Sequence, residues 1–480
     1  KIGLNKGLKI KAFEAEFLQN SGAAADLSPA IAERTLFHAT NSYFVPNVKT
    51  TVYSCKTNLP PNTAFRGFGG PQGMFVIESA IAKAADKIGI DRREIQEANL
   101  LEENDEFSYG QIATEVQAKK SWFEAKEKFE FEKLEQEVTD FNSQNDHYKK
   151  GISLMPITFG ISFTNTPMNH ARALVHIYQD GSVGVSTAAV EMGQGVNTKM
   201  LQVAQDVLGI SSDKVKIETT NTTRVANTSP SAASSTADLN GKAVEMACNS
   251  LVERLKKVAS RILSSDENNI KFEENRVLLN GEKSNLTWNG LIAQAMLERV
   301  ALSENAHYAT PIIHFDKSKE KGHPFAYHVY GTAITTVTLD CLRGVYEIDS
   351  VKIVHDFGKS MNLGIDIGQV EGALAQGIGW MTMEEIAYGN DGRLLSNALS
   401  TYKVPDIFSA PKTVETIPLE TDGNEMAIQK SKAVGEPPLM YGIGTYFAIQ
   451  NAVKAFNKKY KPKYHSPLTP EKVLMGLYEK

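Results

Sequence analysis

The sequence is poor in cysteine. Its 480 residues include three, Cys55, Cys248 and Cys341, which lie far apart along the chain. This number and spacing exclude a disulfide framework, a four-cysteine zinc site and any iron–sulfur cluster held by this chain alone. If the protein transfers electrons, we therefore expect the iron–sulfur relay to come from elsewhere.

Long apolar runs and a surplus of one charge are also lacking. No segment approaches the eighteen apolar residues of a membrane span, and the first residues do not follow the pattern of a secretory signal. The formal net charge is −5 with both signs interspersed, so no basic face is available for nucleic-acid phosphates. We therefore expect an intracellular protein without a membrane or nucleic-acid partner.

Hydrophobic residues make up 42% of the chain, which is enough for a large core, and the length suggests two or more domains. We expect three parts, with boundaries at residues 1–115, 116–147 and 148–480. The middle part is predicted to be one amphipathic connector helix, because Phe131, Leu134, Val138 and Phe141 recur at helical spacing among many charged residues. The chain begins with Lys1 in a strand-like alternation and is interpreted as a fragment.

Glycines punctuate the predicted helices and strands. A helical run around Ile77 and Ile81 is predicted to end at Gly89, and a second run around Met200 ends at Gly209. Residues 173–178 and 183–185 flank an Asp-Gly pair, which predicts a β-hairpin. Residues 227–240 are small and hydroxyl-rich and lead into another helix.

Five segments place glycines, amides and hydroxyls at or just before the start of a predicted helix. They are FRGFGGPQ (65–72), MGQG (192–195), TSPSAASST (228–236), IGQVEG (367–372) and AVGEPP (433–438). The start of a helix has unpaired N–H groups and a positive dipole potential, which suit an anionic or polar ligand. Neither the dinucleotide-binding nor the Walker pattern is present. The segments therefore predict a different, extended cofactor.

Several of these segments resemble signature stretches of the xanthine dehydrogenase and aldehyde oxidase family. The similarity includes residues 65–72, KAVGEPPL (432–439), EMGQG (191–195), NTSPSAAS (227–234), IDIGQVEG (365–372) and STYK (400–403). It extends over essentially the whole chain. The resemblance implies an α+β fold with two molybdopterin-binding domains, of which residues 1–115 are the C-terminal part of the first and residues 148–480 the second.

The resemblance also implies the chemistry, which is hydroxylation of a substrate carbon at a molybdenum centre with oxygen from water. Glu436 would be the general base that deprotonates a metal-bound hydroxyl, a role for which a dry site can raise the pKa of a carboxyl. Arg34 would stabilise negative charge on a purine substrate. Phe68 and Phe163 would flank a planar ring, with Thr164 as a polar neighbour.

The cofactor implied by the resemblance is molybdopterin with molybdenum. The residues expected to bind it are Arg66, Gly67, Phe68, Gln194, Ala232, Ala233, Ser234 and Gln369. Arg66 and Ala233 would approach the metal through their backbone, and no direct protein ligand to the metal is expected. FAD and two 2Fe–2S clusters belong, in the family, to upstream segments that this chain does not contain.

The resemblance favours oxidation of hypoxanthine and xanthine to urate in purine catabolism, because aldehyde oxidases usually lack an arginine at the position of Arg34. Two alternatives stay open, namely an aldehyde oxidase or other N-heterocycle hydroxylase, and a truncated relative without catalytic activity. By family habit we expect a homodimer in the cytoplasm, with the peroxisome as an alternative location. The final electron acceptor, NAD or oxygen, is not fixed by this chain.

Overall fold

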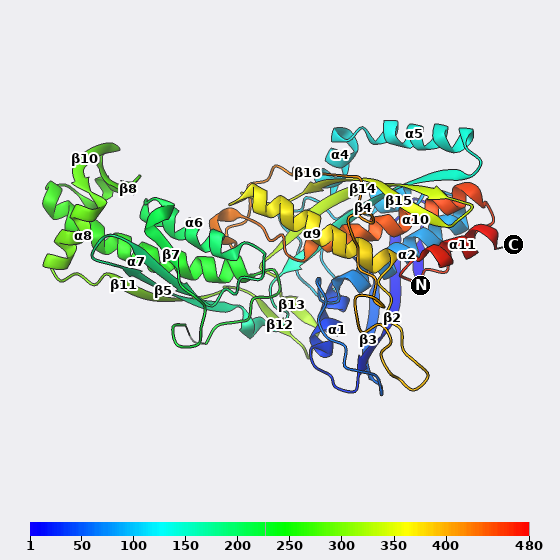
Figure 1. The fold of residues 1–480 in the computed structure, drawn as a ribbon, viewed down its shortest axis with the longest axis horizontal. Coiled ribbons are helices and arrows are strands. Elements are labelled where there is room, and N and C mark those ends of the chain that lie inside the picture. The colour runs from blue at the N-terminus through cyan, green and yellow to red at the C-terminus, as the bar shows by residue number, and fades with distance from the viewer. Residues whose placement is uncertain (226, 480) are drawn as a thin grey trace.

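The computed structural model describes residues 1–225 and 227–479 and has an elongated shape with two lobes (Figure 1). A smaller lobe, drawn in green at the left, contains the strands β5 to β11 and the helices α6 to α8. A larger lobe at the right contains the other strands and α-helices and both chain ends. Within the described residues, no helix is both long enough and apolar enough to cross a membrane.

The larger lobe is built on a mixed four-stranded sheet. Its order is β16 (Thr413–Pro418), β15 (Val345–His355), β14 (Tyr327–Asp340) and β4 (Tyr148–Ile161). Alternate side chains of β14 enter two different cores, Ala333 and Val337 on one face and Tyr330 and Ile334 on the other. Because both faces are covered, no position of β14 is exposed, and the strand does not show the polar alternation of a half-buried strand.

Helices and a second sheet cover these two faces. One core includes residues of α2 (Gly70–Ile88), α9 (Leu363–Thr382), α10 (Gly442–Phe456) and α11 (Pro470–Tyr478). The other includes β2 (Ile10–Gly22), α1 (Ser28–Phe37), α3 (Arg92–Ala98) and α4 (Ala118–Lys128). β2 pairs with β1 (Ile2–Leu4) and β3 (Val48–Lys56), and β12 (His314–Asp316) pairs with β13 (Lys321–His323). The predicted end of α2 at Gly89 is confirmed, with a left-handed φ of 76° at this glycine.

The smaller lobe packs helices on a four-stranded sheet. The sheet order is β11 (Ser303–Ala309), β5 (His170–Ile177), β6 (Val183–Thr187) and β7 (Val215–Ile217), with α6 (Val196–Leu208) and α7 (Thr236–Leu263) in the same core. A three-stranded sheet of β8 (Ile270–Glu273), β9 (Arg276–Leu279) and β10 (Glu282–Thr287) adjoins α8 (Trp288–Leu297). The predicted β5–β6 hairpin and the end of α6 at Gly209 are confirmed.

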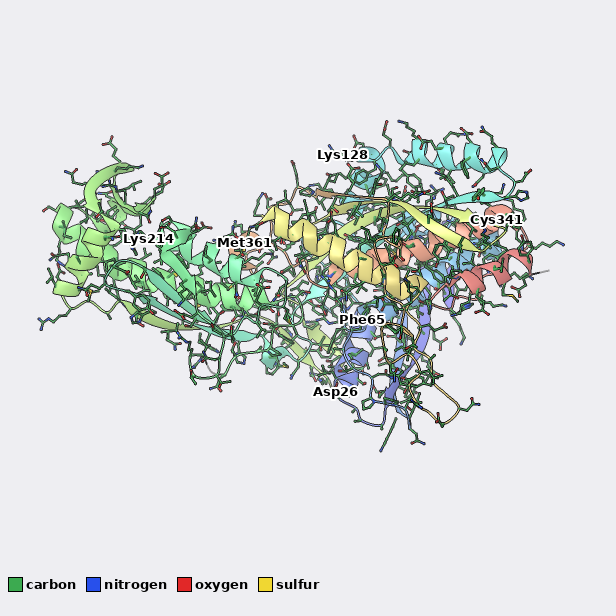
Figure 2. All side chains as sticks on the ribbon, in the orientation of Figure 1. Asp26, Phe65, Lys128, Lys214, Cys341 and Met361 are labelled. Atoms are coloured by element: carbon green, nitrogen blue, oxygen red, sulfur yellow. The ribbon has the colours of Figure 1, made fainter. Side chains whose placement is uncertain are left out.

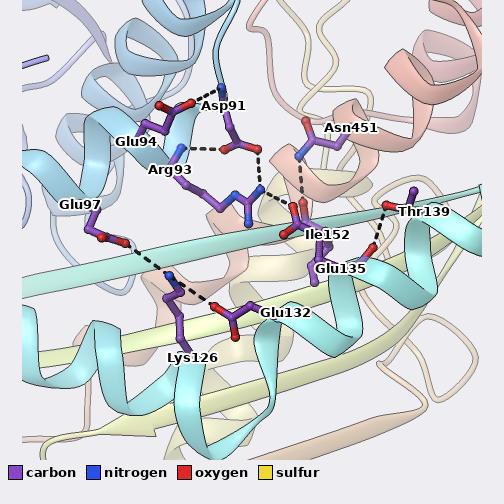
Figure 3. Close-up of polar contacts among 10 residues, drawn as sticks. All are labelled: Asp91, Arg93, Glu94, Glu97, Lys126, Glu132, Glu135, Thr139, Ile152 and Asn451. Atoms are coloured by element: carbon purple, nitrogen blue, oxygen red, sulfur yellow. Dashed lines mark hydrogen bonds and ion pairs between the residues drawn. The ribbon is translucent and has the colours of Figure 1, made fainter.

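The prediction of a single connector helix is wrong. The chain forms α4 and a separate helix, α5 (Phe131–Gln144), because Glu130 has a left-handed φ of 49° between them. Trp122 of α4 is fully buried, whereas α5 buries little beyond Phe131. Figure 3 shows how Arg93 in the first turn of α3 contacts Asp91, which precedes α3, and Glu135 of α5. The two helices thus pack differently, α4 in the core and α5 largely at the surface. The domain boundaries at 115 and 147 stay a prediction.

Candidate active site at the junction of the lobes

The five predicted segments come together around one cavity of about 630 Å³. Its lining includes Arg34, Phe65, Arg66, Phe68, Phe163, Thr164, Gln194, Ala232, Ala233, Ser234, Gln369 and Glu436. These residues come from both lobes, and Figure 2 shows Phe65 near the middle of the molecule. Gly67 lies in the same loop but is not part of the described lining. The sequence pattern therefore identified segments that share one site.

The loop before α2 has three consecutive residues with left-handed backbone. φ is 90° at Gly67, 52° at Phe68 and 99° at Gly69. A phenylalanine rarely adopts this conformation, and such strain persists only where the surrounding structure enforces it. Here a Cβ atom at position 69 would lie 2.2 Å from the carbonyl oxygen of Ile31 in α1. The close approach of this loop to α1 holds Phe68 in the cavity wall.

We expect the substitution Gly69→Ala to lower the free energy of unfolding by about 2–4 kcal/mol, because it adds backbone strain and a steric clash. Gly372→Ala is the matched control. Gly372 is helical, and in the described structure a Cβ atom there would have nothing within 4 Å. The control should keep or slightly raise stability. Urea unfolding measures both, and equal midpoints for the two variants would contradict this account of the loop.

Arg66 connects this loop to two other walls of the cavity. Its guanidinium donates to the carbonyl oxygen of Gly435, to Oε1 of Gln376 at 3.0 Å and to Oε1 of Gln369 at 3.3 Å. Burial lowers the pKa of Arg66, and the nearby Glu436 carboxylate opposes that shift. Gln376 was missed in the sequence, although it stands two helical turns after Gln369. Arg66 therefore fixes α9 and the loop around Glu436 relative to each other.

Glu436 is oriented by Ser234. The Ser234 hydroxyl accepts a hydrogen bond from the backbone N–H of Glu436 at 2.8 Å and donates to Oε2 of its carboxylate at 3.0 Å. Gly435 permits this approach, because a Cβ atom there would lie 2.8 Å from the Ser234 hydroxyl oxygen. Ala233 and Ser234 both have left-handed backbone, with φ of 55° and 56°. The structure thus joins two predicted segments that are 202 positions apart.

Arg34 is buried, with a relative exposure of 1%, yet it lines the cavity. Its guanidinium donates to the carbonyl oxygens of Gly160, at 2.9 Å, and Ser162, and lies 5.0 Å from the ring centre of Phe159. Burial lowers the pKa of Arg34, while the Glu436 carboxylate raises it. The end of β4 thus holds a fixed positive charge in the cavity wall.

Phe163 and Thr164 enter the cavity from the end of β4 on a segment held by Asn169. The Asn169 side chain accepts from the backbone N–H of Phe163 at 2.8 Å and donates to its carbonyl oxygen at 3.0 Å. Asn169 is itself buried, so this clamp is shielded from water. No sequence pattern indicated Asn169, because its contacts with Phe163 form only when the chain folds back over six residues.

The loop before α6 differs from the prediction of free N–H groups. The Glu191 carboxylate accepts from the backbone N–H groups of Gly193 at 2.9 Å, Gly195 at 3.0 Å and Asn197 at 3.0 Å. Desolvation opposes ionisation of Glu191, but these hydrogen bonds outweigh it and lower the pKa. The Gln194 amide donates to its own loop at Val190. This loop therefore offers fewer free donors than its glycines suggested.

Two buried ion pairs join segments that contribute to the cavity. Lys432 contacts Asp356 at 2.6 Å, and Lys199 of α6 contacts Asp366 of α9 at 2.6 Å. The second pair joins the two lobes, as does a hydrogen bond from α6 to the carbonyl oxygen of Met361, which is labelled in Figure 2. In the part of the chain that the structure describes, no group of three or more His, Cys, Asp or Glu side chains could hold a metal ion.

The fold is shared with solved oxidoreductase structures. Quinoline 2-oxidoreductase from Pseudomonas putida 86 matches 100% of this chain and 61% of its own, with a TM-score of 0.87 and 22% identity. CO dehydrogenase from Oligotropha carboxidovorans matches 99% of this chain and 60% of its own, with a TM-score of 0.86 and 21% identity. At these identities the similarity establishes the architecture, an α+β fold around a cavity between two lobes.

Two family models, both described as molybdopterin cofactor-binding domain, match residues 1–100 and 124–411. The chain belongs to the molybdopterin cofactor-binding domain family. The resemblance inferred from the sequence and the expected pair of α+β cofactor-binding domains are thereby confirmed.

Curated relatives support the same assignment. The xanthine dehydrogenase/oxidase of Felis catus is 40% identical over 98% of this chain, which covers 34% of that protein. Xanthine dehydrogenase 1 of Arabidopsis thaliana is 37% identical over 100% of this chain, which again covers 34% of that protein. The chain thus spans about a third of the length of these relatives.

Proposed function

We propose that this protein is a molybdenum hydroxylase that oxidises hypoxanthine and xanthine to urate, with water as the source of oxygen. The proposal depends on one observation, which is that Glu436, Arg34, Phe68 and Phe163 line the same cavity. This combines a carboxylate base, a fixed cation and two aromatic rings, as a flat, electron-poor and partly anionic heterocycle requires.

The polar lining fits a phosphorylated pterin. Gln194, Gln369 and Arg66 bring amide and guanidinium groups to the lining, and Ser234 brings a hydroxyl whose proton is donated to Glu436. Among the described residues, α7 begins at the cavity without a side-chain cap, so its first N–H groups can face a ligand, whereas at the start of α2 Gly70 donates to Gly67 and Pro71 has no N–H. We propose that these groups, with Gly67, Phe68, Ala232 and Ala233, hold molybdopterin, with the backbone of Arg66 and Ala233 nearest the metal. The cofactor would supply the two-electron oxidation.

The protein residues would accept the proton and stabilise the developing negative charge. Glu436, held through Oε2 by Ser234, would accept the proton of the attacking hydroxyl as it adds to the substrate carbon. Arg34 would stabilise the negative charge that develops on the purine oxygens. Phe68 and Phe163 would orient the ring, with Thr164 beside it, and would exclude water from the reacting carbon.

We expect Arg34→Met to lower kcat/KM for xanthine by about 10²-fold, as loss of one preorganised charge donor does, while benzaldehyde turnover falls far less. Benzaldehyde serves as the internal control, because the buried Arg34 also supports the fold through Gly160 and Ser162. Urate and benzoate formation are measured in the wild type and the variant. Equal losses for both substrates, or a wild type that prefers benzaldehyde, would favour an aldehyde oxidase over a purine hydroxylase.

We further propose that electrons leave the site through two 2Fe–2S clusters and FAD, as part of a cytoplasmic homodimer that passes them to NAD or oxygen. The chain contains three free cysteines, Cys55, Cys248 and Cys341, which cannot ligate such clusters. The clusters would therefore be bound by polypeptide outside these 480 residues.

A further inference from the structure

Asp238 is a buried carboxylate in the first turn of α7, and the site described above does not use it. Its relative exposure is 8%. Oδ2 accepts a hydrogen bond from the Tyr327 hydroxyl at 2.7 Å, and Oδ1 accepts one from the backbone N–H of Ile428 at 3.1 Å. Two donors on different segments therefore face the two oxygens of one carboxylate.

The Tyr327 hydroxyl also contacts the loop that carries Glu436. It accepts a hydrogen bond from the backbone N–H of Ala433 at 3.1 Å. Burial and the nearby Asp238 raise the pKa of Tyr327 well above its ordinary value, so the hydroxyl keeps its proton and donates it to Asp238. A continuous path thus runs from Asp238 through Tyr327 to Ala433, three positions before Glu436.

The segment held at Ile428 is strained. Gln429 and Lys430 both have left-handed backbone, with φ of 49° and 59°. Non-glycine residues keep such conformations only where their surroundings enforce them. Gly241, one turn after Asp238, lets α7 approach closely, because a Cβ atom there would lie 2.8 Å from Cγ1 of Ile428. Asp238 thus acts on the segment at the point where α7 and the loop meet.

We propose that Asp238 is a positioning residue, which as a carboxylate anchors residues 428–436 and thereby sets the place of Glu436. This deepens the proposed function and rests on it for the role of Glu436. The ionised form is needed because both facing groups are donors. A protonated acid or an asparagine offers one acceptor and one donor, so either the Tyr327 hydroxyl proton or the Ile428 N–H would lose its acceptor.

Ionisation of Asp238 falls in an accessible range. Burial raises its pKa from 3.8 to about 6, against hydrogen bonds from Tyr327 and Ile428 and the charges of Lys199 on α6 and Lys242 on α7. Tyr308 of β11 also faces it. Because the folded pKa exceeds the unfolded one, this group favours folding at low pH, and the contribution is lost as pH rises from about 4 to 6. The anchored form therefore exists above pH 6 at a cost in stability.

The test is hydrogen–deuterium exchange of residues 428–436 in the purified protein, corrected for the intrinsic rate at each pH. In the wild type we expect protection to rise from pH 5 to 7.5, with a midpoint near pH 6, because local opening of the loop breaks the two hydrogen bonds that favour the carboxylate and leaves Asp238 buried in α7. Asp238→Asn should abolish this midpoint and speed exchange at pH 7.5 about fivefold, the factor that one net hydrogen bond supplies. Its unfolding temperature at pH 7.5 should stay equal or rise, because no charge is buried.

Glu78→Gln is the matched control, because Glu78 is also buried and accepts from a tyrosine hydroxyl, that of Tyr43, at 2.6 Å. It should leave exchange of residues 428–436 unchanged. Tyr327→Phe is a second variant that keeps the ring and should speed exchange at Ala433 even if the asparagine variant fails to fold. Wild-type exchange without a midpoint, or unchanged exchange in both variants, would overturn the proposal.

The same experiment separates this proposal from the function. Altered loop exchange in a protein that does not oxidise xanthine would support the positioning role and remove the proposed function. Xanthine oxidation with unchanged exchange in the variants would support the proposed function and remove the positioning role of Asp238.

Discussion

Replacing Glu436 by glutamine is expected to lower xanthine turnover by about 10²–10⁴-fold, the contribution of a positioned general base. The amide has nearly the same size as the carboxylate but cannot accept the proton at pH 7. The backbone hydrogen bond from residue 436 to Ser234 should survive, so the loop keeps its place. The loss should therefore appear in kcat, with little change in the unfolding temperature.

The control for this experiment is Glu371→Gln, on the exposed side of α9 two residues after Gln369. It removes the same charge close to the site without touching the cavity lining. Urate formation and molybdenum content are measured for both variants. If Glu436→Gln keeps more than a tenth of wild-type turnover at equal molybdenum content, Glu436 is not the base.

Replacing Asp356 by asparagine is expected to lower the free energy of unfolding by about 3–5 kcal/mol. The substitution leaves the Lys432 ammonium, with 2% side-chain exposure, without its opposite charge. Asp356 also accepts from the hydroxyl of Thr421 at 2.8 Å and the backbone N–H of Gly358 at 3.1 Å. Because an isolated buried charge is costly, replacing one carboxylate oxygen by an amide nitrogen greatly lowers the free energy of unfolding.

The matched control is Asp86→Asn, which breaks the exposed pair with Lys454. Surface pairs of this kind contribute about 0–1 kcal/mol, so the control should shift the urea midpoint little. The double variant Asp356→Leu with Lys432→Met should recover part of the loss, because it removes both charges together. Equal effects of Asp356→Asn and Asp86→Asn would show that the buried pair does not support the fold.

The predictions from sequence succeeded where local chemistry decides the structure. Gly89 and Gly209 end α2 and α6 because the left-handed conformation at a helix end suits glycine. The Asp-Gly turn before β6 is equally local. The prediction of a single connector helix failed because no local pattern records the left-handed backbone at Glu130 or the different burial of the two helices.

The same distinction applies to the cavity. The five segments could be found because small and hydroxyl-bearing residues cluster in each of them. The contacts between these distant parts of the chain could not be predicted, because Ser234 meets Glu436, and Lys199 meets Asp366, only after those parts have packed. The loop before α6 is another feature that the sequence pattern did not predict. There the Glu191 carboxylate binds the N–H groups of the glycines that follow it, which had been predicted to bind a ligand.

The contact of Arg66 with Gly435 joins positions 369 residues apart. During synthesis on the ribosome, the wall that Gly435 and Glu436 provide does not exist until nearly all of these 480 residues have emerged. A nascent chain therefore has no complete pocket to offer. A cofactor that contacts all of these walls would therefore bind after this part of the chain has been made.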